Sequence, residues 1–239
     1  MKRALSVFAI LFVAASPVHA ADNIDQIDQL PQSEFRQVSE DLGAALSYKA
    51  LIPAEPLGLG GFDIGVEVTD TNIHNRDAWD HAFSGAAPDP LYIPKLHVHL
   101  GLPAAFDIGA FYGQAPNSNV ELWGAELQYA IIEGSTAMPA LAVRGTYSQL
   151  SGVDQLDLHT SGLELSISKG IAMFTPYGGL GRVWTTAQPV GIPTLKTEEF
   201  DQDKYFVGCN LNLGIINLAI EGDKTGDTDS YGLKLGFRF

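Results

Sequence analysis

Ten short segments in which apolar and polar residues alternate constrain the fold of this chain more than any other feature. The last of them, YGLKLGFRF, keeps the alternation to the final residue, Phe239. A period of two is the signature of a β-strand with one apolar and one polar face. The segments cover residues 62–69, 95–102, 106–113, 121–132, 140–150, 156–168, 175–186, 204–214, 218–224 and 231–239. The sequence therefore predicts an all-β fold with about ten strands, in which only the face of the 175–186 segment is ambiguous.

The connections between these segments alternate in length. LPAA, EGSTAMP, KGIAM and GIIN are tight, whereas DTNIHNRDAWDHAFSGAAPDPLY and AQPVGIPTLKTEEFDQD are longer and mostly polar. Short turns at one end and longer acidic loops at the other are typical of an antiparallel up-and-down β-barrel that spans an outer membrane. Unpaired backbone groups cost several kcal/mol each in lipid, so such a sheet must close on itself.

The first twenty residues, MKRALSVFAILFVAASPVHA, combine a basic tip, an apolar run and small residues before Ala20. This pattern predicts a secretory signal peptide over residues 1–20, which is cleaved after export. The apolar run is shorter than the ~20 residues of a transmembrane helix. We therefore expect three parts: the signal peptide, an N-terminal segment over 21–61, and the barrel over 62–239.

Charge and cysteine content exclude several kinds of protein. The formal net charge is −14, which argues against a nucleic-acid partner because phosphate binding requires a basic patch. Cys209 is the only cysteine, so no intramolecular disulfide can form. It falls on the apolar face of its segment, where we expect it to act as a small hydrophobic residue.

The segment 62–239 resembles the outer-membrane β-barrel proteins of Gram-negative bacteria. The resemblance depends on the signal peptide, the ten alternating segments and the C-terminal aromatic residue. It implies an exported protein in the outer membrane, surrounded by lipid and lipopolysaccharide. It also implies that the barrel assembly machinery reads the last strand, through Tyr231, Leu233, Leu235, Phe237 and Phe239.

The same resemblance places both chain ends in the periplasm, which requires an even number of strands. Ten segments satisfy this, and a twelve-stranded barrel with two weak strands before residue 62 is the alternative. Residues 21–61 are then a periplasmic or lumen-inserted segment that resembles a plug. Within it QSEFRQVSEDL has the spacing of a short amphipathic helix, and Pro53 and Pro56 interrupt an apolar stretch.

If the apolar face meets lipid, the other face lines the lumen. The predicted lumenal polar residues are Glu67, Lys95, His97, His99, Glu126, Arg144, Glu164, Glu221, Lys234 and Arg238. Acids and bases balance among them, which predicts an ion-pair network that fills the barrel, with a charged path for a solute as the alternative. Barrels of about 8 strands are filled by their own side chains, and those of about 16–18 strands leave an aqueous channel. With ten strands we do not expect a general diffusion porin.

Two of the lumenal residues, and the acids of the loops, are candidate ligands for metal ions. His97 and His99 could bind a metal, but the sequence offers no third ligand at a defined spacing, so we expect no metal and no cofactor. The acidic loops predict either a solvated rim or bridging of divalent cations to lipopolysaccharide. The acids concerned are Asp70, Asp77, Asp80, Asp89, Asp154, Asp157, Asp201, Asp203, Asp227 and Asp229.

Three functions fit these observations. The first is a non-enzymatic structural barrel, or a narrow, plugged transport barrel for a small or hydrophobic solute. The second is an omptin-like rim hydrolase, suggested by Asp157-x-His159 and Asp201-x-Asp203. The third is a soluble periplasmic barrel similar to a lipocalin, since alternation alone does not say which face is wet.

Overall fold

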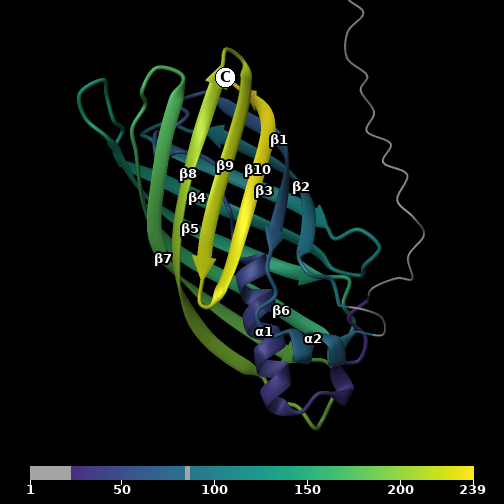
Figure 1. Ribbon diagram of the computed structural model, residues 1–239. Helices are drawn as coiled ribbons and strands as arrows, with labels where there is room; N and C mark the ends of the chain where they lie inside the picture. The colour runs from purple at the N-terminus through teal and green to yellow at the C-terminus, as the bar shows by residue number, and fades with distance from the viewer. Residues whose placement is uncertain (1–22, 84–86) are drawn as a thin grey trace, which may run out of the picture.

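The computed structural model describes residues 23–83 and 87–239, and the expected signal peptide lies outside the described residues. It contains one closed antiparallel barrel of ten strands in sequential order (Figure 1). The strands are β1 (Phe62–Thr71), β2 (Leu91–Gly101), β3 (Phe106–Gln114), β4 (Glu121–Ile132), β5 (Ala140–Ser151), β6 (Leu156–Ser168), β7 (Phe174–Pro189), β8 (Glu198–Leu213), β9 (Ile216–Thr225) and β10 (Thr228–Arg238). The predicted fold is confirmed with ten strands, and no further strand pair precedes β1 in the described part of the chain.

Three helical elements accompany the barrel: η1 (Ile27–Gln29), α1 (Gln32–Leu46) and α2 (Arg76–Ala82). The helix expected in QSEFRQVSEDL is therefore present and extends to Leu46. None of the helices in the described residues has the length and apolar character needed to cross a membrane. Figure 1 shows α1 and α2 at the end of the barrel opposite the C-terminus. We call the helical end the outer end and the C-terminal end the inner end.

The barrel closes between its first and last strands. Phe62 and Phe239 exchange two backbone hydrogen bonds of 2.9 Å, and their rings lie 6.0 Å apart. From there β1 pairs with β10 without interruption up to Thr71 and Ser230. The last nine residues are thus needed for closure, because residues 231–238 pair with β1 and Phe239 bonds to Phe62. Their alternation turns one set of side chains toward lipid and the other toward the lumen. Recognition of this strand during assembly stays a prediction.

The outward face of the barrel is apolar and carries aromatic side chains toward both ends. Exposed Ile64, Val66, Leu165, Val207 and Leu235 occupy the middle of this face. Aromatic residues toward the outer end are Tyr92, Tyr112, Trp123, Trp184 and Tyr231, and those toward the inner end are Phe62, Tyr129, Phe174, Phe237 and Phe239. An apolar band between two aromatic girdles is how a transmembrane barrel meets lipid and its two interfaces. A soluble lipocalin-like barrel would need the opposite arrangement, with its apolar face inside.

The outer end differs from the expected ring of acidic loops. Asp70, Asp157, Asp201, Asp203 and Asp229 lie within strands. The reason is clearest in β7 and β8, which have 16 residues each and keep pairing as far as Ala187 and Glu198. Backbone pairing continues there beyond the aromatic girdle, because the antiparallel ladder needs no lipid. The connection at 226–227 is also only a tight turn, so not every outer connection is long.

Residues 23–61 pass through the lumen, and we call them the plug. At the outer end the Ile24 amide donates to Asn119 Oδ1 (3.0 Å) and the Ile27 amide to Gln155 Oε1 (3.0 Å). Helix α1 then contacts β5, β6, β7, β8 and β10 from inside. At the inner end the Leu57 amide donates to Asp107 (3.1 Å). Because the plug crosses the barrel, Ile24 and Phe239 lie at opposite ends, which differs from the expectation of both chain ends on one side.

Candidate functional site: the plugged lumen

The outer half of the lumen is filled by apolar contacts between α1 and the barrel wall. Phe35, Val38, Leu42 and Leu46 recur at helical spacing on α1, and each is buried. Trp79 of α2 is buried in the same cluster. The wall contributes Ile93, Phe111, Leu122, Leu150, Leu158 and Ala187 to it. The mouth of the barrel is therefore sealed by a hydrophobic core, as in a soluble domain.

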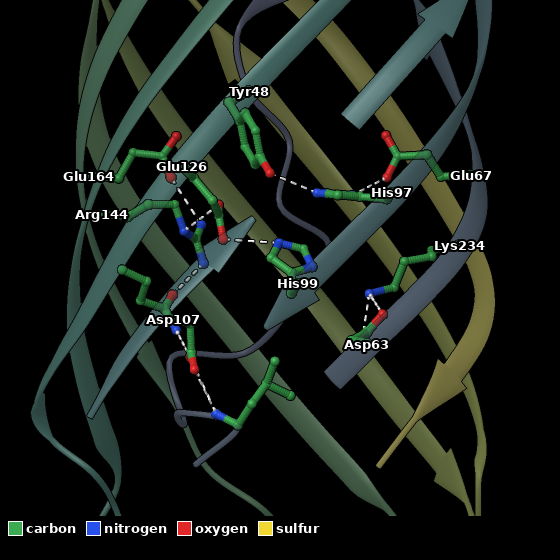
Figure 2. Close-up of polar contacts among 12 residues, drawn as sticks. Tyr48, Asp63, Glu67, His97, His99, Asp107, Glu126, Arg144, Glu164 and Lys234 are labelled. Atoms are coloured by element: carbon green, nitrogen blue, oxygen red, sulfur yellow. Dashed lines mark hydrogen bonds and ion pairs between the residues drawn. The ribbon is translucent and has the colours of Figure 1, made fainter. Parts of the chain in front are cut away.

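The inner half of the lumen is lined by ion pairs. Glu67 of β1 pairs with Lys95 (3.1 Å) and His97 (2.8 Å), both on β2. The side chains of all three are fully buried. Figure 2 shows Glu67 and His97 on the wall, with His97 facing Tyr48 of the plug. Burial of a carboxylate costs free energy of dehydration, and the two partners of Glu67 offset much of that cost.

A second group of ion pairs continues around the wall from β2 to β8. Glu126 lies between His99 (2.9 Å) and Arg144 (3.0 Å). Arg144 also reaches Glu164 (3.1 Å), and Glu164 in turn pairs with Lys204 (2.7 Å). Charges of opposite sign thus alternate along the wall, so that each charge in this group has at least one partner. Figure 2 shows the part from His99 to Glu164.

Close to the inner end, Asp63 is the centre of a further pair. Lys234 Nζ lies 2.9 Å from one of its oxygens and Arg238 lies 4.0 Å from the other. Nearby, Asp107 accepts a hydrogen bond from Gln128 (3.2 Å) and another from the plug backbone at Leu57. The first pair joins β1 to β10, whereas Asp107 connects β3, and through Gln128 β4, to the exit of the plug.

Tyr48 and Lys49 of the plug lie where the two halves meet, and we call this pair the latch. The Tyr48 hydroxyl lies 2.8 Å from His97 Nε2, and the backbone carbonyl of Tyr48 accepts a hydrogen bond from Lys204. Lys49 Nζ pairs with Asp223 of β9 at 3.6 Å. It also donates to the carbonyl of Ala44 (2.9 Å), near the C-terminal end of α1, where a cation complements the helix dipole. The latch therefore binds the plug to β2, β8 and β9 at once.

Glycines make room for the large lumenal side chains. A Cβ at Gly109 would come within 2.3 Å of the His99 ring, and one at Gly181 within 2.9 Å of the Glu164 side chain. The charged side chains thus lie flat across glycines of neighbouring strands. This close approach lets the network and the plug share a narrow barrel.

The structure brings the sequence-predicted lumenal residues together. Nine of the ten are buried in the interior, and Arg238 is partly exposed at the inner end. Sequence reasoning missed Asp63, Asp107, Lys204 and Asp223, which the same alternation places on the lumenal face. It also missed the latch, for which no periodicity gives a signal.

The balance of lumenal charge changes when these residues are included. On the wall, seven carboxylates face five cations among the described residues. The carboxylates are Asp63, Glu67, Asp107, Glu126, Glu164, Glu221 and Asp223, and the cations are Lys95, Arg144, Lys204, Lys234 and Arg238. The expected cancellation is therefore incomplete, and Lys49 of the plug supplies one further cation.

The two histidines pair with carboxylates in this arrangement. His97 and His99 have ring centroids 4.2 Å apart, and each contacts a different glutamate. In the described residues no group of three or more His, Cys, Asp or Glu side chains has the arrangement of a metal site.

The candidate residues for a rim hydrolase contact other partners and do not form an Asp–His pair that could activate water. His159 faces outward and its ring lies 5.9 Å from that of Tyr147. Asp157 accepts a hydrogen bond from Gln149 (3.1 Å). Asp201 and Asp203 both pair with Arg182, at 3.1 and 2.7 Å.

A cleft of about 510 Å³ opens at the outer end between the plug and strands β8 to β10. Most of the charged groups that line it are acidic: Glu40, Asp41, Asp201, Asp203 and Asp227, with Lys224 as the cation. Burial raises the pKa of Asp41, against hydrogen bonds from the Asn75 amide (2.9 Å) and Thr228 (3.0 Å). These bonds fix α1 to the outer loop and to β10.

Comparison with known proteins finds no matching family model and no match among curated proteins. Among solved structures, the chain is similar to the KdgM porin in complex with disordered oligogalacturonate (8% identity, TM-score 0.40, covering 74% of this chain and 99% of that one). It is also similar to the beta domain of the Bordetella autotransporter BrkA (11%, 0.40, 76% and 100%). A third is the N-terminal β-barrel domain of Pseudomonas aeruginosa OprF (10%, 0.37, 74% and 97%). At these scores the comparison concerns the barrel fold, not the lumen.

Proposed function

We propose that this outer-membrane β-barrel protein is a plugged barrel, in which residues 23–61 close a narrow polar passage for a small solute. The observation that supports this most directly is the latch. Tyr48 and Lys49 are buried in the middle of the lumen and bind side chains on three different strands. In the middle of the lumen the plug is held by a few polar contacts, and these can be removed by changing two side chains.

The lining of the inner half favours a passage over a purely structural filling. Buried ion pairs are often no more stabilising than well-packed apolar residues of similar volume. A barrel that only needed a filled interior could therefore continue the apolar packing of its outer half to the other end. Charged groups become useful if water and a solute enter the lumen when the plug moves.

A structural role is the second candidate, and the packing of α1 favours it. Leu42 and Leu46 are fully buried against the wall, so movement of α1 would expose apolar surface. In this case the plug is a permanent core, and the protein contributes to the envelope as a rigid barrel.

Planar-bilayer conductance separates these candidates. The unaltered protein should be nearly silent, whereas Tyr48→Phe combined with Lys49→Met should show small, discrete openings because the side-chain contacts to His97 and Asp223 are lost. The bond from Lys204 to the Tyr48 carbonyl remains in this variant. Lys169→Met is the matched control, because its ammonium binds carbonyls of an inner turn outside the lumen. Openings only in the latch variant support a gated passage.

A disulfide between the plug and β7 would allow the passage to be closed and reopened in the same protein. The Cβ of a residue at position 43 would lie 3.3 Å from Thr185 Cβ, a little under the usual range for a disulfide. Gly43→Cys with Thr185→Cys, in a Cys209→Ser background, should close the latch variant when oxidised and reopen it when reduced. Silence of the folded, reduced latch variant would favour the structural candidate instead.

A further inference from the structure

The Lys49 ammonium occupies a defined position against the wall. Its side chain is 1% exposed and that of Asp223 is 2% exposed. Besides Asp223, the ammonium contacts three plug oxygens: the carbonyls of Ala44 (2.9 Å) and Ser47 (3.2 Å) and the Ser47 hydroxyl (3.1 Å). The wall therefore supplies the only negative charge that this cation touches among the described residues.

The carboxylate of Asp223 is held in place independently of Lys49. The Thr225 hydroxyl donates to Asp223 Oδ1 (3.1 Å), which leaves Oδ2 directed at the ammonium. Glu221 lies two residues earlier on β9, buried and facing the same lumen. If the plug moves, Lys49 leaves with it and these two carboxylates remain on the wall.

We infer that Asp223 and its surroundings form a binding position for an ammonium-type monovalent cation, which Lys49 occupies while the barrel is closed. The solute that the open barrel passes is then a small cation. This second part depends on the proposed function, whereas the binding position does not. In the closed barrel the ammonium lies about 3 Å from carbonyl and hydroxyl oxygens of the plug, and the wall adds the carboxylate of Asp223. A single carboxylate is a poor set of ligands for Ca²⁺, whereas it can pair with an ammonium.

The charge of the lumen and of its outer entrance supports the same class of solute. Once Lys49 has left, carboxylates on the wall outnumber cations by two. The outer cleft adds Glu40, Asp201, Asp203 and Asp227. Three cations reduce this effect: Arg182 pairs with Asp201 and Asp203, Arg36 pairs with Glu40, and Lys224 lines the cleft. A cleft of predominantly one sign raises the local concentration of counter-ions, here cations.

Chemical rescue tests the binding position in the full chain. Lys49→Ala removes the part of the side chain that propylammonium can replace. Propylammonium chloride should raise the midpoint of heat-dependent gel migration of this variant, compared with an equal concentration of sodium chloride. It should have no effect on the unaltered protein or on Lys49→Ala combined with Asp223→Asn. An equal effect on the double variant, or from sodium chloride, would overturn the binding position.

Folding of Lys49→Ala is itself informative. If the variant does not fold in sodium chloride, the yield of refolded barrel becomes the readout. Restoration by propylammonium that requires Asp223 supports the position, and failure of propylammonium to restore the yield refutes it.

Ion selectivity tests the solute class. Openings of the Tyr48→Phe/Lys49→Met protein in a potassium chloride gradient should reverse close to the potassium potential, and Asp223→Asn should move that value toward zero. A reversal potential close to that of chloride would refute the passage of cations, although it would still show that the barrel has a passage. A folded barrel with no openings would refute passage altogether, and the rescue experiment would then decide the binding position by itself.

Discussion

The two halves of the lumen are built from the same strands but hold the plug in opposite ways. Along β2 the lumenal residue changes from Ile93 to His97, and along β4 from Leu122 to Glu126, as each strand runs between the outer and inner ends. In the outer half, non-directional apolar contact seals the mouth, and each residue contributes in proportion to the area it buries. In the inner half, most buried charges have a specific partner of opposite charge, as Glu67 has Lys95 and Asp63 has Lys234. Substitutions in the outer half should therefore lower stability gradually, in proportion to the apolar area lost. In the inner half, loss of one partner should lower stability strongly.

The first prediction concerns which end of the plug faces outward, and its effect is all or none. Asp28→Cys at the outer end should react with a membrane-impermeant maleimide on intact cells, in a Cys209→Ser background. Leu59→Cys, 80% exposed at the inner end, should react only after the outer membrane is permeabilised. The reverse pattern would show that the outer and inner ends have been assigned the wrong way round.

The next largest effect is expected in the inner half. Arg144→Ala leaves Glu126 and Glu164 with fewer partners in a buried site, and should lower the free energy of unfolding by about 3–5 kcal/mol. Urea unfolding in lipid vesicles measures this. Arg182→Ala is the matched control, because it also pairs with two carboxylates but is exposed to solvent, and it should change stability little. Similar losses for both arginines would contradict the contrast between buried and exposed pairs.

A smaller, graded effect is expected in the outer half. Leu46→Ala creates a cavity beneath a fully buried side chain and should cost about 3 kcal/mol in the same unfolding assay. The variant should keep the barrel closed, since its neighbours still cover the mouth. Leu59→Ala is the control and should leave stability unchanged. If Leu46→Ala opened the barrel in bilayers while Tyr48→Phe did not, the outer half and not the latch would hold the plug.

The smallest effect is expected at the surface of the outer end, where pH can be used. The hydrogen bond from His81 to Glu34 raises the pKa of His81 above its usual value of 6.5. A raised pKa in the folded state means that the stabilisation is complete below about pH 6.5 and is lost as pH rises through the higher value. The unfolding midpoint should therefore fall slightly on going from mildly acidic to alkaline pH, and His81→Ala should reduce that dependence. If His81→Ala kept the same pH dependence of the unfolding midpoint, groups other than His81 would be responsible for it.

Much of the barrel follows from the sequence because strand periodicity is a local property. An alternation from Phe62 to Phe239 determines which residues share a face. The resemblance to outer-membrane barrels implied that the apolar face meets lipid, and the structure buries the charged face inside the barrel. Glu67, Lys95, Arg144 and Glu164 could be placed in the lumen on that basis. Their partners could not, because pairing depends on register and on which side chains lie flat across glycines such as Gly181.

Only the tertiary structure decided where residues 23–61 lie. The sequence left three locations open for them: the lumen, the periplasm and a weak strand pair of the barrel. The contacts of Ile24 with Asn119 and of Leu57 with Asp107 join positions separated by 95 and 50 residues. No local pattern encodes contacts over such separations, because each needs a closed barrel of one particular width. The sequence by itself therefore determined the strands of the barrel wall. Closure of that wall in three dimensions decided that the plug crosses the lumen and that Lys49 contacts Asp223.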